Sequence, residues 1–128
     1  MGKNDGLLLL LLFASAKKGA TVTNSKALSF EAIESLARSV GFPDPELAAA
    51  IALAESSGIA TAVGDGGTSI GLWQINTTAH PQFSRADLVD PTFNAQTALG
   101  ISKRGTDWKP WSTYNSGAYK RFLKTPRP

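Results

Sequence analysis

Glu55 is the residue whose type and setting most clearly suggest chemistry. It directly follows the apolar run Leu47–Ala54, which has the character of a helix buried on most faces. Burial disfavours the charged form of a carboxyl group, so this glutamate should have a raised pKa. A carboxylic acid that stays protonated near neutral pH can donate a proton to a leaving-group oxygen. Position alone also allows a glutamate that points into water from the last turn of the helix.

Large aromatic side chains and amides accompany this candidate acid. The rings offer flat apolar faces that could stack on sugars, although such rings also fill protein cores. The amides can donate to and accept from sugar hydroxyl and acetamido groups. We therefore predict a substrate-binding role for all of the residues named below except Tyr119. The rings are Trp73, Trp108, Trp111, Tyr114 and Tyr119, and the amides are Gln74, Asn76 and Asn115.

Three short motifs follow one another along the chain. They are Glu55-Ser56-Ser57-Gly58, then Gly71-Leu72-Trp73-Gln74-Ile75-Asn76, then Tyr114-Asn115-Ser116-Gly117. Together they resemble the soluble lytic transglycosylase and goose-type lysozyme group. With flanking helices, the resemblance extends over residues 29–123.

The resemblance implies a lysozyme-like α domain with a glycan-binding groove. It implies that Glu55 protonates the oxygen of the β-1,4 bond between N-acetylmuramic acid and N-acetylglucosamine in bacterial peptidoglycan. Tyr114 would lie near Glu55 and orient it. Gln74 and Asn76 would line the sugar subsites, and Ser56 would hold either the substrate or the helix end.

The fate of the cleaved sugar depends on a second carboxylate, because hydrolysis usually uses two. The stretch from Asp65 to Asn76 also resembles chicken-type lysozymes, but the second acid of that family would fall at Ser69. The sequence therefore favours a lytic transglycosylase, in which Glu55 acts twice and the product is a 1,6-anhydro sugar. The alternative is a hydrolytic lysozyme in which Asp65 positions water. Asp65 precedes a glycine, which is also a common turn pair.

Composition bears on the other classes of function. Thirteen basic and ten acidic residues give a net charge of +3, which suits an anionic wall polymer but lacks the dense basic stripe of a nucleic-acid binder. A non-catalytic wall-binding module remains an alternative, although a binder has no need for a buried acid. Cysteine is absent and His80 is the single histidine. We expect no metal and no cofactor, because acid/base glycoside cleavage needs neither.

The elements that position these residues are predicted to be mainly helices. Ser29 should cap a helix that ends at Gly41. Asp44 and Pro45 should start a central helix that carries Glu55 in its last turn. Two further helices are expected over residues 92–104 and 117–123, and a small β element in the middle. The predicted fold class is mostly α, of the α+β lysozyme-like kind, in a single small domain.

The N-terminal part is apolar and then polar. Residues 7–14 form an apolar run that ends in an Ala-Ser-Ala pattern, as at a signal-peptidase site. We expect residues 1–16 to be a cleaved signal, a membrane-touching peptide or a segment packed on another protein, and residues 17–27 to be a linker. The catalytic domain would span 28–124. An extracellular, envelope or virion-associated location is expected, as a monomer or as a component of a larger virion assembly.

Overall fold

The computed structural model describes residues 26–127, so the predicted segment 1–16 and most of the predicted linker lie outside the described residues. In this described part, no helix is long and apolar enough to cross a membrane. The elements in order are α1 Phe30–Val40, α2 Pro45–Ser56, β1 Val63–Gly64, the 3-10 turn η1 Asp65–Gly67, β2 Ser69–Ile70, β3 Ile75–Asn76, α3 Arg85–Leu88, α4 Pro91–Ile101, α5 Ser112–Ser116 and the 3-10 helix η2 Ala118–Phe122. The mostly α fold class with a small sheet is confirmed.

The first helix begins and ends where the capping residues predict. The Ser29 side chain accepts a hydrogen bond from the backbone N–H of Ala32 at 3.1 Å. Gly41 ends α1 in the left-handed conformation, with φ +109°. Ile33 and Ala37 form the fully buried face of this helix, as their helical spacing indicates.

The second helix is the central one. Its N-cap is Asp44, whose side chain accepts from the backbone N–H of Leu47, and Pro45 occupies the first helical position. Residues 48–52 are completely buried. The run is rich in alanine, which lets α1, α5 and η2 pack close to the α2 backbone. The helix ends beside Glu55, so the acid lies at the junction between a buried helix and the loop that follows.

The β element is a three-stranded antiparallel sheet in the order β1-β2-β3. Gly64 pairs with Ser69 in the first hairpin, and Ser69 pairs with Asn76 in the second. Both Ser69 and Ile70 are buried, so the central strand is enclosed although each strand has only two residues. The tight turn η1 joins β1 to β2 and carries Asp65.

A buried asparagine on α4 holds the sheet to the helices. The Asn94 side-chain oxygen accepts from the Trp73 N–H, and its amide nitrogen donates to the carbonyls of Ile70 and Leu88, all at 2.9 Å. Gly71 lies against this amide with φ +84°, and a Cβ there would collide with the Asn94 side chain and the Leu88 carbonyl. The Gly-Leu-Trp-Gln motif therefore begins with glycine for a packing reason.

The helices that follow α3 differ from the two predicted for this part of the chain. Helix α4 ends at Ile101, before the predicted end at residue 104, because the buried Ser102 hydroxyl donates to the Leu99 carbonyl and accepts from the Gly105 N–H. The predicted helix 117–123 is the 3-10 helix η2, and a separate short helix, α5, precedes it. Gly117, with φ +84°, separates the two.

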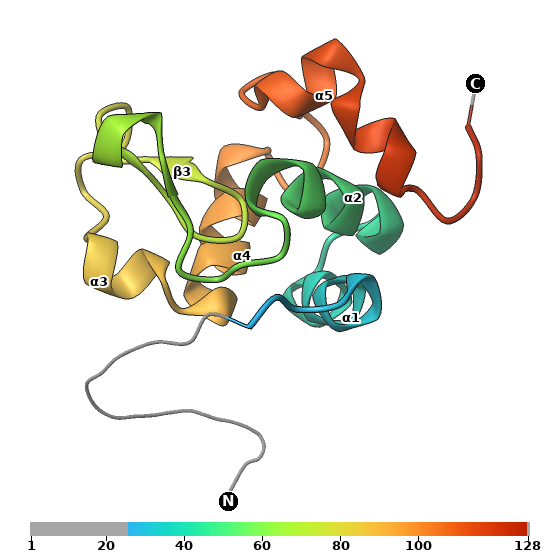
Figure 1. The fold of residues 1–128 in the computed structure, drawn as a ribbon, viewed down its shortest axis with the longest axis horizontal. Coiled ribbons are helices and arrows are strands. Elements are labelled where there is room, and N and C mark those ends of the chain that lie inside the picture. Colours follow the sequence, from blue (N-terminus) through green and yellow to red (C-terminus); the bar gives the residue numbers. More distant parts are fainter. Residues whose placement is uncertain (1–25, 128) are drawn as a thin grey trace, which may run out of the picture.

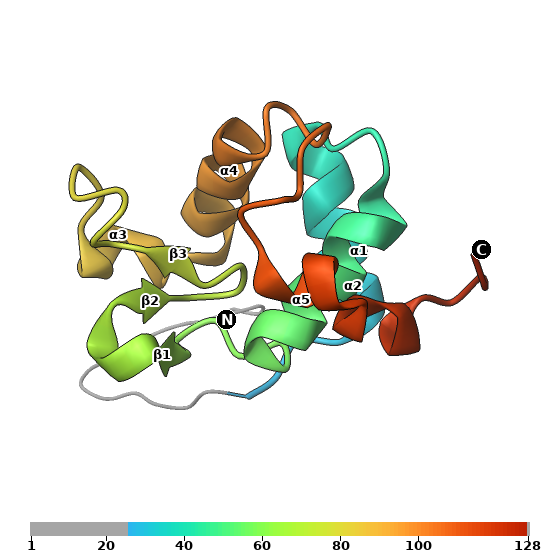
Figure 2. The same ribbon diagram turned by 90° about the horizontal axis from the view of Figure 1, so that it is seen from above.

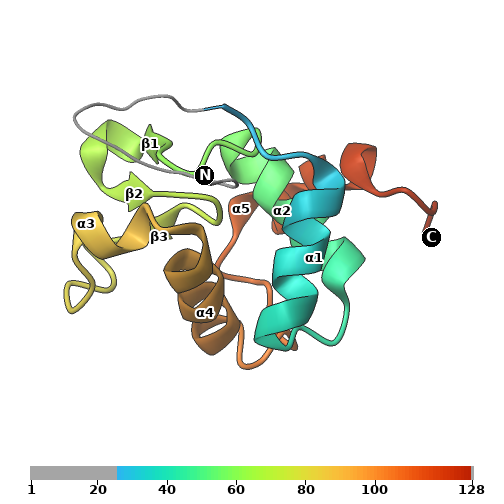
Figure 3. The same ribbon diagram turned by 90° about the horizontal axis from the view of Figure 1, so that it is seen from below.

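The pair of helices α1 and α2 and the sheet occupy opposite ends of the domain. The sheet and α3 lie at one end, α1 and α2 lie at the other, and α4 stands between them in all three views (Figures 1, 2 and 3). The C-terminal segment lies on the α1 and α2 side, away from the sheet (Figure 1). Arg127 pairs with Asp44, so residues beyond the predicted boundary at 124 are attached to the domain.

Candidate functional site

The Glu55 carboxyl group is partly buried in the last turn of α2. The Thr113 hydroxyl, on α5, donates to its Oε2 atom at 2.7 Å, and the Thr113 backbone also hydrogen-bonds the carboxylate. The pKa of Glu55 is raised above its ordinary value of 4.5, chiefly because burial removes the charged form from water. The two hydrogen bonds from Thr113 lower this pKa, and the negative charge of Asp65 raises it. Burial outweighs the hydrogen bonds, so the net effect of the surroundings is to raise the pKa of Glu55.

Ser56 ends the helix that carries the acid. Its buried hydroxyl donates to the Ala52 carbonyl at 2.9 Å and accepts from the Gly58 N–H at 3.2 Å. Of the two roles predicted for Ser56, these contacts support the one at the helix end. Gly58 itself has φ +82°, and a Cβ at this position would collide with the Leu28 carbonyl. The Glu-Ser-x-Gly motif thus fixes the chain directly after the acid.

Asp65 is the acid whose charge acts on Glu55. It lies in the turn between β1 and β2 with φ +51°, a conformation that aspartate tolerates better than most residues. The Ser69 hydroxyl donates to Asp65 Oδ2 at 2.6 Å. The Thr68 hydroxyl donates to the Asp65 backbone carbonyl at 2.9 Å. Position 69 therefore does not supply an acid itself but binds one that comes from four residues earlier.

The residue of α5 that hydrogen-bonds Glu55 is Thr113, which directly precedes the Tyr-Asn-x-Gly motif, and the predicted role of Tyr114 stays a prediction. The Tyr114 ring is instead stacked on Tyr119, with centroids 5.2 Å apart and an interplanar angle of 19°. Within residues 26–127, the side-chain hydrogen bond to Glu55 comes from Thr113. Sequence reasoning missed this residue because nothing in its type or spacing marks it. Its neighbour Tyr114 was favoured through the family resemblance alone.

The three tryptophans belong to the core, which corrects their predicted role in sugar stacking. Trp73 is completely buried, and its ring N–H donates to the Ala48 carbonyl at 3.1 Å. Trp108 and Trp111 are each only 5% exposed. The Trp111 ring N–H donates to the Trp73 carbonyl at 2.7 Å. Phe42 is stacked between Trp73 and Trp108, so the faces of these rings are covered by other rings rather than open to a ligand.

The three amides shape the loops around the site. The Gln74 amide nitrogen donates to the carbonyls of Ala62 and Gly71, at 3.1 and 3.0 Å, which uses both of its hydrogens. The Asn76 side-chain oxygen accepts from two backbone N–H groups just after β3. The exposed Asn115 amide donates to the Lys109 carbonyl at 2.8 Å. Their roles toward sugars stay predictions.

Between residues 26 and 127, no group of three or more histidine, cysteine, aspartate or glutamate side chains is placed to hold a metal ion. His80 lies beside the Phe83 ring, with centroids 6.4 Å apart. The chemistry that the arrangement offers is acid/base chemistry, with one desolvated carboxyl group and a second carboxylate near it.

Comparison with known protein families gives a match over most of the described chain. Residues 34–113 match the family described as the lysozyme-like domain. The matched range begins in α1 and ends at Thr113, so it contains Glu55, Asp65 and the whole sheet. Neither the curated proteins nor the solved structures contain a match.

Proposed function

This chain belongs to the lysozyme-like domain family, and we propose that it cleaves the β-1,4 bond between N-acetylmuramic acid and N-acetylglucosamine with Glu55 as the general acid. Membership of the family indicates a glycosidase that binds peptidoglycan and works outside the cell or in its envelope. The finer assignment, the bond and the residues that act on it, is the proposal. Export through residues 1–16 and association with a virion stay predictions.

One observation carries this proposal. Glu55 is a desolvated carboxylic acid with a raised pKa, held by Thr113 at the end of the central helix. A proton donor of this kind is what departure of a sugar oxygen requires, because the leaving alkoxide must be neutralised as the bond breaks. A structural or purely binding role offers no reason to keep a carboxyl group where burial opposes its charge.

The geometry supports hydrolysis as the second half of the reaction. Glu55 gives its proton to the bridging oxygen, and water adds to the anomeric carbon of the muramic acid. Asp65 takes the proton that the attacking water releases. The observation behind this role is that the charge of Asp65 acts on Glu55, while Ser69 binds its carboxylate at 2.6 Å. The sequence favours the other route because position 69 is a serine and because the Tyr-Asn-x-Gly motif is present, whereas the contact between Ser69 and Asp65 supports the hydrolytic alternative.

A lytic transglycosylase is the second candidate, favoured by the Glu-Ser-x-Gly and Tyr-Asn-x-Gly motifs. On this route no water enters. Glu55, once ionised, takes the proton of the muramic acid 6-hydroxyl, and that oxygen closes on the anomeric carbon. The product is a 1,6-anhydro sugar, lighter than the hydrolysis product by one water. The position of Tyr114, stacked on Tyr119, gives this route no added support from the structure.

The test is digestion of purified peptidoglycan in water enriched in oxygen-18, followed by mass spectrometry of the released muropeptides. We expect reducing ends that carry the heavy oxygen, and their loss in Glu55→Gln. Glu46→Gln, a change on the same helix far from the site, is the matched control. Anhydro ends without the heavy label would replace hydrolysis by the transglycosylase route. Equal digestion by the wild type and Glu55→Gln would overturn the role of Glu55, and no digestion by either would favour the wall-binding module.

A further inference from the structure

Ser69 is anchored far more firmly than the acid it contacts. It lies in the central strand β2, is 2% exposed, and pairs with Gly64 on one side and Asn76 on the other. Its neighbour Ile70 pairs with Val63 and Ile75 in the same sheet. The Ser69 hydroxyl therefore extends from a backbone that is held by strand pairing on both sides.

Asp65, by contrast, has little that fixes its side chain. It is exposed, has a left-handed backbone, and is followed by Gly66 and Gly67, which also have positive φ values. A short carboxylate on such a turn would otherwise sample several rotamers in water. The Ser69 hydroxyl donates to one of its oxygens at 2.6 Å, the length of a strong hydrogen bond to a charged acceptor. The second contact, from Thr68, fixes the Asp65 backbone and not its carboxylate.

We infer that Ser69 is a positioning residue, which holds the Asp65 carboxylate in one place so that the turn, and not position 69, supplies the second acid of the site. This inference deepens the proposed function and rests on it. The buried strand gives the rigid support, and the turn gives the charge. Because the strand supplies the support and the turn supplies the charge, a serine can occupy the place where chicken-type lysozymes carry their second acid.

An ordinary turn-stabilising role is the competing explanation, because serine hydroxyls often bond to nearby aspartates in turns. The two explanations differ in what happens at Glu55. A turn contact affects only the stability of the hairpin. A positioning contact also sets how strongly Asp65 repels the ionised form of Glu55, because the charge of Asp65 is the one that acts on this group among residues 26–127.

The test is an NMR titration of the Glu55 carboxyl carbon in the full chain, carried out on a set of variants. Asp65→Asn removes the charge, so the pKa of Glu55 should fall while burial still keeps it raised. Ser69→Ala frees the carboxylate and should shift the pKa in the same direction by a smaller amount. Ser69→Thr keeps the hydroxyl and should restore the wild-type value. In Asp65→Asn, adding Ser69→Ala should cause no further shift.

Activity on peptidoglycan gives the second readout. Ser69→Ala should lower kcat about 10-fold with little change in KM, because a displaced carboxylate no longer faces the attacking water. Thermal unfolding separates this from loss of structure, and Ser69→Thr is the variant that should fold and work. An unshifted Glu55 pKa in Ser69→Ala, or an equal shift with and without Asp65, would overturn the inference. The titration needs no catalysis, so an inactive wild type would contradict the proposed function without affecting this test.

Discussion

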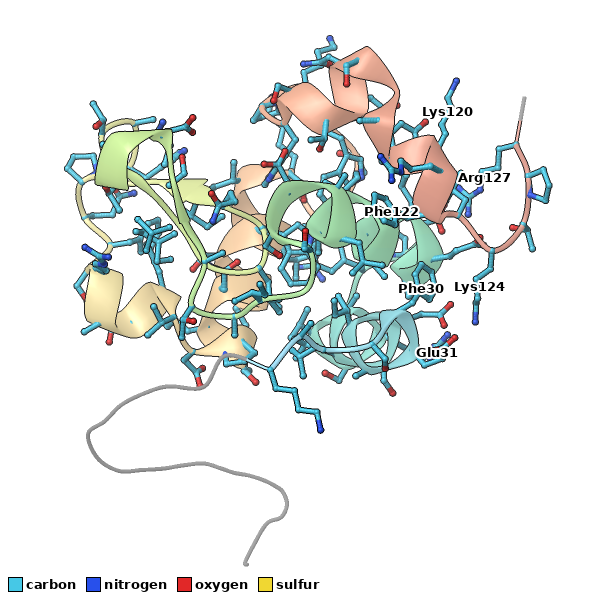
Figure 4. All side chains as sticks on the ribbon, in the orientation of Figure 1. Phe30, Glu31, Lys120, Phe122, Lys124 and Arg127 are labelled. Atoms are coloured by element: carbon cyan, nitrogen blue, oxygen red, sulfur yellow. The ribbon has the colours of Figure 1, made fainter. Side chains whose placement is uncertain are left out.

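Helix α2 carries two glutamates whose surroundings could hardly differ more. Glu46, near its N-terminus, accepts from the Thr125 backbone N–H at 2.7 Å and from the Thr125 hydroxyl at 2.8 Å, and pairs with Arg127 at 3.3 Å. These contacts, with the backbone bond from Thr125 the largest, lower the pKa of Glu46 below 4.5. Glu55, at the other end, has a raised pKa because it is buried. Figure 4 shows the C-terminal segment that supplies Arg127, on the side of the molecule where α1 carries Phe30.

The difference shows that the groups packed around each end of the helix decide the pKa of these carboxyl groups. The N-terminal end of a helix carries partial positive charge and favours an anion, whereas the C-terminal end disfavours one. Glu46 accepts hydrogen bonds from Thr125 and Arg127. Glu55 is affected instead by hydrogen bonds from a threonine and by the charge of a second carboxylate. One element thus holds a carboxyl group with a lowered pKa at one end and one with a raised pKa at the other.

The largest expected effect comes from removing the proton donor. Glu55→Gln should lower kcat/KM on peptidoglycan by about 10²- to 10⁴-fold, the range typical of a general acid. Glu46→Gln should stay within about twofold of the wild type, since its contacts are with the C-terminal segment. Turbidity loss of purified walls measures both. Similar losses of activity in the two variants would contradict a specific role of Glu55 and would indicate a general effect on the fold.

A smaller effect is expected from the hydrogen bond that orients the acid. Thr113→Val removes the hydroxyl that donates to Glu55, so kcat should fall about 10-fold. Because this bond lowers the pKa of Glu55, its loss should move the alkaline limb of kcat/KM to higher pH. Thr113→Ser keeps the donor and is the control. An alkaline limb that stays in place, or moves to lower pH, in Thr113→Val would speak against the assignment.

The opposite end of the helix should show its effect in stability. Asp44→Ala removes the N-cap of α2 and the partner of Arg127, and should lower the free energy of unfolding in urea by about 1–2 kcal/mol. Hydrogen bonding to Arg127 is the main reason that the pKa of Asp44 is lowered below 3.8. A depressed pKa gives stability that is present above 3.8 and lost as the pH falls through the folded-state value. The cost of the substitution should therefore shrink in acid.

Arg127→Ala is the matched control, because it leaves the cap and removes only the ion pairs. The Asp44 and Arg127 side chains are 39% and 33% exposed, so this variant should cost less than about 1 kcal/mol. The loss should diminish in high salt. An Arg127→Ala cost as large as that of Asp44→Ala would mean that the ion pairs, and not the cap, stabilise the start of α2.

The smallest expected effect is a gain in stability on losing the acid. The pKa of Glu55 is raised above 4.5, so its contribution to stability is fully present below 4.5 and is lost as the pH rises through the folded-state value. Glu55→Gln resembles the protonated form and should be more stable than the wild type at pH 7, with no difference below pH about 4. Chemical denaturation at the two pH values measures it. A wild type that is the more stable protein at pH 7 would contradict the desolvation of Glu55.

The parts of the fold that the sequence predicted depend on neighbours along the chain. Ser29 and Gly41 bound α1, and Asp44 with Pro45 starts α2, because caps act within one helical turn. Glu55 stood out because the apolar run before it belongs to the same helix. Residues close together in the sequence were therefore sufficient to predict the ends of α1, the start of α2 and the candidate acid.

The features that could not be predicted from the sequence depend on contacts between distant segments. Trp73 is an aromatic that suits a sugar face or a core equally well, and only its bond to the Ala48 carbonyl decides for the core. Thr113 reaches Glu55 from a separate helix, and Asn94 serves the sheet from α4. The early end of α4 follows from the hydroxyl of Ser102, whose type is unremarkable in a sequence.

The most direct test of the account compares two quantities for one carboxyl group. NMR gives the pKa of Glu55 in the folded protein, and the alkaline limb of kcat/KM gives the pKa of the acid that must be protonated in the free enzyme. We predict that the two values coincide above 4.5, while Glu46 titrates below 4.5 in the same spectra. A Glu55 that titrates at or below 4.5, or an alkaline limb that lies elsewhere, would contradict the claim that desolvation at the end of α2 makes Glu55 the proton donor.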